Sequence, residues 1–104
     1  MARFDVYTNP DPDERPHTPF ILDLQNGVLN ALQTFAAVPL RDAARLQAPV
    51  SRLQPILKVN GQAVVMDTPM LAAFPRRSVG SPIANLRNAQ IEIQDALDTL
   101  FGEY

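Results

Sequence analysis

The chain begins with a short run in which apolar and polar side chains alternate, the period-2 pattern of a β-strand. Residues 4–8 place Phe4 and Val6 on one face and Asp5 and Tyr7 on the other. In a strand, successive side chains point to opposite faces of the sheet. We therefore expect the first strand of a sheet here.

A second alternating run, residues 20–24, ends in Asn26-Gly27, a pair that favours a tight turn because both residues tolerate positive φ. The apolar pattern returns over about 32–40, so the two runs predict a hairpin. Pro39 lacks an amide donor, which indicates an edge strand or the end of a strand at that point.

The clearest local signal is a second hairpin. Residues 56–59 and 63–66 are apolar runs that flank Asn60-Gly61, the pair best suited to a two-residue turn. Farther along, residues 71–74 fit either a short helical turn or a strand.

Two segments between these runs lack a regular pattern. Residues 9–19 contain four prolines among acidic residues, and proline removes backbone donors that a sheet needs, so we expect an exposed loop. Residues 41–53 are mixed in character and are interpreted as a connection.

From about residue 85 the spacing of apolar residues changes to 3.6, which predicts an amphipathic helix over about 86–101. Its apolar stripe consists of Leu86, Ala89, Ile93, Ala96, Leu97 and Leu100. Asn85 suits the N-cap, and Gly102 suits a left-handed C-cap. Phe101 lies at the margin of the stripe, and Ile91 lies outside it. An apolar residue on a polar face can mark an interface, although single exposed apolar residues are common.

Composition narrows the function classes. The 104 residues suffice for one domain, 1–104, and 46% apolar with 19% charged residues is typical of a globular protein. A net charge of −2 gives no bulk attraction to nucleic acid, so DNA association is expected only through a partner. The absence of cysteine excludes disulfides and thiolate metal sites. Without an apolar leader or spanning segment, we expect a soluble, cytoplasmic protein that does not contact membranes.

Candidate catalytic residues are few. His17 lies in the proline-rich loop without an assignable nucleophile. Arg76-Arg77 could hold a phosphate or an acidic peptide, but such a pair is more often a solvated turn. Asp95 and Asp98 are spaced for one helical face, where an ordinary hydrated surface is the simpler interpretation. We therefore expect no enzyme, no cofactor and no metal site.

An ordered set of segments carries a family resemblance. The segments are Phe4-Asp5-Val6-Tyr7-Thr8, Phe20-Ile21-Leu22-Asp23-Leu24-Gln25, Val38-Pro39-Leu40, Pro55-Ile56-Leu57, Val64-Val65-Met66, Phe74-Pro75, Val79-Gly80, Ile83-Ala84-Asn85-Leu86 and the helix from Ile93 to Phe101. In order and nearly in spacing, they resemble the CcdB family of plasmid and chromosomal toxins.

The resemblance implies an α+β, mainly β fold: an SH3-like barrel of the CcdB, Kid and MazF type, with a main antiparallel sheet, a smaller sheet and a terminal helix, assembled as a homodimer. It also implies a type II toxin that binds the A subunit of DNA gyrase and traps the cleavage complex. A CcdA-like antitoxin would neutralise it, within systems that serve plasmid maintenance and regulate their own transcription. The resemblance implies gyrase-binding residues at Val28, Leu29, Asp95, Asp98, Gly102, Glu103 and Tyr104. To these we add Ile91, which lies outside the apolar stripe, and Phe101 at the helix end.

The end of the chain departs from the family pattern. In the family, the tryptophan of a Phe-Trp-Gly-Ile tail stacks on an arginine of gyrase A. Here the tail is Phe101-Gly102-Glu103-Tyr104, so the tryptophan that would recognise this arginine is missing in the direct register. A shift of one position would let Phe101 stack instead. Two alternatives therefore stay open: a toxin-derived dimer that binds antitoxin without poisoning gyrase, and an endoribonuclease of the MazF or Kid type.

Overall fold

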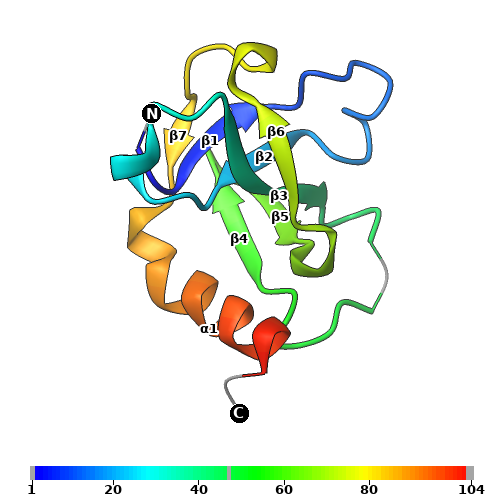
Figure 1. Ribbon diagram of the computed structural model, residues 1–104. Coiled ribbons are helices and arrows are strands. Elements are labelled where there is room, and N and C mark those ends of the chain that lie inside the picture. The colour runs from blue at the N-terminus through cyan, green and yellow to red at the C-terminus, as the bar shows by residue number, and fades with distance from the viewer. Residues whose placement is uncertain (1, 47, 103–104) are drawn as a thin grey trace.

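An antiparallel sheet and one C-terminal helix make up the computed structural model, which describes residues 2–46 and 48–102 (Figure 1). The strands are β1 (Asp5–Thr8), β2 (Phe20–Asp23), β3 (Thr34–Asp42), β4 (Ile56–Val59), β5 (Gln62–Met66), β6 (Ala72–Pro75) and β7 (Ala84–Asn85). The α-helix is α1 (Gln90–Phe101), and short 3₁₀ turns form η1 (Gly27–Leu29), η2 (Thr68–Met70), η3 (Arg76–Ser78) and η4 (Arg87–Ala89).

The strands are hydrogen-bonded in the order β4-β5-β3-β2-β1-β7, and β6 pairs with β3 off this path. The sheet curves into a nearly closed barrel with α1 beside it, so the expected α+β, mainly β barrel is confirmed. The expected smaller sheet is not separate. The first half of β3 pairs with β6 and its last residues pair with β5, so a single long strand joins both parts.

Pro39 does not mark an edge or a strand end, contrary to expectation. It lies inside β3, between the residues that pair with β6 and those that pair with β5, where neither strand requires its amide. On this side the Pro39 carbonyl accepts a hydrogen bond from the Asp67 amide at 3.0 Å. A central proline is tolerated because the partner strand changes at this residue.

The two expected hairpins have different outcomes. The β4–β5 hairpin is confirmed, with Asn60 at φ 49° and Gly61 at φ 87°, both left-handed as a type I′ turn requires. The β2–β3 pairing is also confirmed, but no two-residue turn closes it. Asn26 has φ −55°, and its side-chain oxygen accepts from the Val28 amide, which starts η1 instead. Side-chain capping here replaces the expected turn geometry.

The main core lies between the concave side of the sheet and α1. It contains buried residues from both ends of the chain, including Val6, Leu22, Val38, Met66 and Ile93. A smaller cluster on the other side of β1–β3 holds Tyr7, Ile21, Phe35 and Ala37. Both faces of the first strands are therefore buried.

The C-terminal helix is confirmed, but its start is later than expected. Residues 87–89 form η4, and the Asn85 side chain accepts from the Arg87 amide at 2.9 Å, so it caps η4 and not α1. α1 itself starts at Gln90. Gly102 ends it at φ 80°, and its amide donates to the Asp98 carbonyl, as a left-handed C-cap does.

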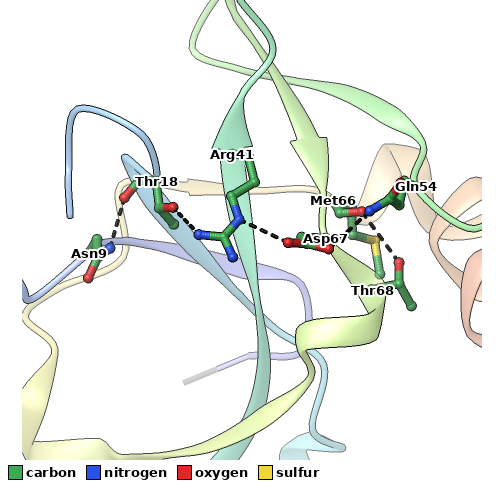
Figure 2. A network of polar contacts seen from close by, with 7 residues as sticks. All are labelled: Asn9, Thr18, Arg41, Gln54, Met66, Asp67 and Thr68. Carbon is green, nitrogen blue, oxygen red and sulfur yellow. Dashed lines mark hydrogen bonds and ion pairs between the residues drawn. The ribbon is translucent and has the colours of Figure 1, made fainter. Parts of the chain in front are cut away.

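A polar network holds the proline-rich loop and the connection after β3 against the barrel (Figure 2). Arg41 of β3 donates from Nε to Asp67 Oδ2 at 2.9 Å and from Nη1 to the Thr18 hydroxyl. Gln54 donates to the other Asp67 oxygen at 3.0 Å. Asn9 donates to the Thr18 carbonyl at 2.8 Å, which closes the base of the loop.

Candidate functional site

The turn η1 presents apolar side chains to solvent. Val28 is 83% exposed and Leu29 is 44% exposed, and the nearby Leu32 is half exposed at 50%. No residue of η1 is buried, so these side chains do not serve the core. Burying apolar surface is favourable, and a cluster of exposed apolar residues on one turn is therefore suited to a protein contact.

The outward face of α1 is the second element. Ile91 is 78% exposed, and Phe101 at the last helical turn is 68% exposed. Residues three and four apart share one side of a helix, so Ile91, Asp95 and Asp98 lie together. The buried stripe that contains Ile93 faces the opposite way. The expected position of Ile91 outside the buried stripe is therefore confirmed, and Phe101, expected at the margin of the stripe, is largely exposed.

Asp95 is bound within the chain and is not a simple hydrated acid. Arg52 donates from Nε and Nη2 to the two Asp95 oxygens at 3.1 and 2.8 Å, a bidentate pair. Arg52 has φ 69°, a left-handed conformation that is uncommon for a residue other than glycine. Nothing in the sequence pattern signals this pair, because the two residues are far apart along the chain.

A groove of about 450 Å³ adjoins the Arg52–Asp95 pair, between the connection before β4 and α1. Its walls are Pro49, Ser51, Arg52, Gln54, Pro55, Ile56, Glu92 and Asp95. Ile56 at the edge strand β4 is 64% exposed. The helix face thus continues into a partly apolar groove.

The turn and the helix end form two separate patches within one chain. In Figure 1, η1 lies toward the start of α1, whereas the red end of α1 is at the far end of the molecule. Polar contacts join the two parts indirectly: Arg3 donates to the Leu24 carbonyl at 3.0 Å and to the Gln94 side chain at 3.3 Å. Gln94 in turn donates to Asp98 at 3.0 Å.

At the chain end, Gly102 lies at the helix C-cap. Glu103 and Tyr104 lie outside the described residues. The part of the expected site that the structure describes therefore ends at the C-cap, directly after Phe101.

Two buried ionisable side chains, Asp23 and Tyr7, lie near the segment that leads into the turn. Asp23 is 2% exposed, and burial raises its pKa although the Gln25 amide and Arg76 act in the opposite direction. Burial raises the pKa of Tyr7 to about 12, with further contributions from Asp5 and Asp23. These groups sit on β1 and at the end of β2, immediately before the segment that leads into η1.

Asp23 predicts a distinct pH dependence of stability. The raised pKa means that Asp23 binds its proton more tightly in the folded state than in the unfolded state. The stabilising contribution of protonated Asp23 is therefore complete below the unfolded-state pKa and is lost as the pH rises through the folded-state pKa. Asp23→Asn keeps an acceptor for Gln25 and abolishes this titration. In urea titrations, we expect the variant to gain on the wild type as the pH rises above the ordinary pKa of an aspartate, about 3.9. An unchanged difference between the two would contradict this.

The other candidates have no assembled chemistry. His17 is exposed in the loop, and its carbonyl accepts from the Asp42 amide. Within residues 2–46 and 48–102, no three His, Cys, Asp or Glu side chains are grouped to hold a metal ion. No helix in the same ranges has the length and apolar character needed to cross a membrane.

Comparison with known proteins identifies the family. The family model described as CcdB protein matches residues 3–102, nearly the whole chain. No curated protein gives a significant match. The matched range includes both the η1 turn and the complete α1 helix, the two elements of the candidate site. The chain therefore belongs to the CcdB family, toxins of toxin–antitoxin systems.

Proposed function

We propose that this toxin binds the A subunit of DNA gyrase and traps the enzyme's cleavage complex, without catalysing a reaction itself. The observation that carries the proposal is the exposure of apolar side chains on two elements: Val28 in the η1 turn, which the family resemblance indicates, and Ile91 and Phe101 on α1. A CcdA-like antitoxin neutralises the toxin by binding it in the cytoplasm.

The chemistry of the helix face suits a basic target. Asp95 and Asp98 lie one and two turns along from Ile91 on the outward side of α1, and the Asp98 carboxylate is contacted by the neutral Gln94 amide. An exposed apolar residue with an acid next to it can hold the stem and the guanidinium of one arginine at the same time. Asp95 contributes negative charge, although its pairing with Arg52 neutralises part of it.

Phe101 takes the place of the missing tryptophan. It is the last helical residue, and the left-handed Gly102 turns the backbone away directly after it, which leaves the ring 68% exposed. An arginine placed over an aromatic ring gains about 0.5–2 kcal/mol, depending on desolvation. A phenyl ring provides a weaker cation–π partner than an indole, so we expect weaker binding than a tryptophan would give.

The proposal includes a homodimer, which would bring the two separate patches into one contact surface. A two-fold homodimer repeats each patch, so that the η1 turns and the α1 ends of both protomers can border one shared surface. Two copies of each contact on a single target surface would also raise the apparent affinity. DNA is then reached only through gyrase or through the antitoxin complex, consistent with a net charge of −2.

A growth experiment tests this proposal. Expression in a bacterial host with ordinary gyrase is expected to stop growth, and co-expression of the antitoxin is expected to restore it. A host whose gyrase A lacks the recognised arginine should survive. Equal killing of both hosts would contradict the proposal, and degraded cellular RNA would favour an endoribonuclease. Binding of antitoxin without growth arrest would favour the toxin-derived dimer.

A further inference from the structure

Arg76, the first residue of η3, forms hydrogen bonds with the segment that contains η1. Its guanidinium donates from Nε to the Leu32 carbonyl and from Nη2 to the Leu29 carbonyl at 3.2 Å. Its backbone amide donates to the Gln33 carbonyl at 2.9 Å. One side chain thus reaches two carbonyls that lie three residues apart in the exposed segment.

The guanidinium itself is held in place from below. It lies 5.8 Å from the centre of the Phe35 ring, which is fully buried in the smaller cluster. The positive charge also acts favourably on the buried Asp23 carboxylate, lowering its pKa against the effect of burial. Arg76 is therefore anchored to the rigid sheet on one side and bonded to the turn on the other.

Local hydrogen bonds define the turn in part. The amides of Leu29, Asn30 and Leu32 donate to the carbonyls of Asn26, Gly27 and Leu29, and the Val28 amide donates to the Asn26 side chain. A single turn of 3₁₀ helix without buried side chains is marginal by itself. The tertiary bonds from Arg76 to the Leu29 and Leu32 carbonyls therefore add to the stability of the turn.

We propose that Arg76 is a positioning residue that keeps the η1 turn, with Val28 and Leu29, in its binding-competent conformation. This rests on the proposed function, because it assigns a cause for the shape of that contact surface. The neighbouring Arg77 has a different status: it is exposed and makes no hydrogen bond or ion pair with any residue that the structure describes. The Arg76-Arg77 pair is thus one structural residue and one solvated residue.

The size of the effect follows from population arithmetic. A ligand that binds only the formed turn has an apparent Kd equal to the intrinsic Kd divided by the fraction formed. Removal of two hydrogen bonds from a charged donor is expected to raise the equilibrium constant for opening of the turn about 10- to 100-fold. Exchange of the turn amides should accelerate by this factor, whereas affinity should fall only by the factor by which the formed fraction decreases.

The experiment compares Arg76→Gln with the matched control Arg77→Gln. Hydrogen exchange of the Leu29, Asn30 and Leu32 amides, relative to β3 amides, measures opening of the turn without any partner. We expect about 10- to 100-fold faster exchange for Arg76→Gln and wild-type exchange for Arg77→Gln. Arg76→Lys keeps the charge but loses the fork, so its exchange should fall between. Equal exchange in the Gln variants would overturn the proposal.

Affinity for gyrase A separates positioning from a general loss of stability. We expect Arg76→Gln to weaken binding, by no more than the factor seen in exchange, and to weaken it no further when Val28 and Leu29 are already alanine. A full additional loss in that background would overturn the proposal, because Arg76 would then act through other residues. If the wild type does not bind gyrase A, the proposed function fails while the exchange measurement still decides the role of Arg76.

Discussion

Asp67→Asn is expected to lower the free energy of unfolding by about 2–3 kcal/mol. Asp67 accepts on both oxygens, from Arg41 Nε at 2.9 Å and from Gln54 Nε2 at 3.0 Å. An asparagine has only one acceptor oxygen, so its amide group would face one of these two donors. Arg41, whose side chain is only 25% exposed, would lose its ion pair.

Urea unfolding measures this loss, and Asp42→Asn is the matched control. Asp42 lies 3.9 Å from Arg45, whose side chain is 51% exposed, and its other oxygen accepts from the Ala44 amide, a role that asparagine keeps. We expect the control to change stability by less than about 0.5 kcal/mol. Similar losses of unfolding free energy in both variants would contradict a particular stabilising role for the network around Arg41.

Val28→Lys is expected to weaken binding to gyrase A about 100-fold while leaving the fold unchanged. Val28 is 83% exposed, so its replacement removes little from the core. In the proposed complex, however, a lysine would place an unpaired charge in an apolar contact and would face a basic target. Calorimetric titration of gyrase A measures the affinity, and thermal unfolding checks the fold.

Val50→Lys provides the matched control for that experiment. Val50 is likewise exposed, at 57%, but lies in the connection between β3 and β4 and outside the expected contact. It should bind gyrase A as the wild type does. If both variants bind equally well, the η1 turn is not part of the contact surface.

The elements determined by local chemistry could be predicted from the sequence. The Asn60-Gly61 turn is one example, since both residues adopt the positive φ that their chemistry permits. The buried stripe of α1 is another, because a 3.6 spacing leaves only one face for a core. The predicted first residue of the helix was wrong because residues between β7 and α1 form the 3₁₀ turn η4.

Features determined by distant partners could not be predicted. Pro39 lies inside a strand only because β3 exchanges one neighbour for another there. Asp95 is paired because the connection before β4 brings Arg52 against the helix. Arg76 and Arg77 are adjacent and chemically identical, yet only the first meets the η1 carbonyls. The contact residues of the turn stay a prediction that rests on the family resemblance, since no periodic pattern singles out Val28.

A DNA cleavage assay with purified gyrase tests directly whether this toxin traps the cleavage complex. Supercoiled plasmid, gyrase, ATP and the toxin are incubated, and trapped complexes are released as linear DNA by detergent and protease. We expect linear DNA that increases with toxin concentration, disappears on addition of antitoxin, and is absent with gyrase that lacks the recognised arginine. Full gyrase activity with no linear DNA, at toxin concentrations that saturate the antitoxin, would contradict it.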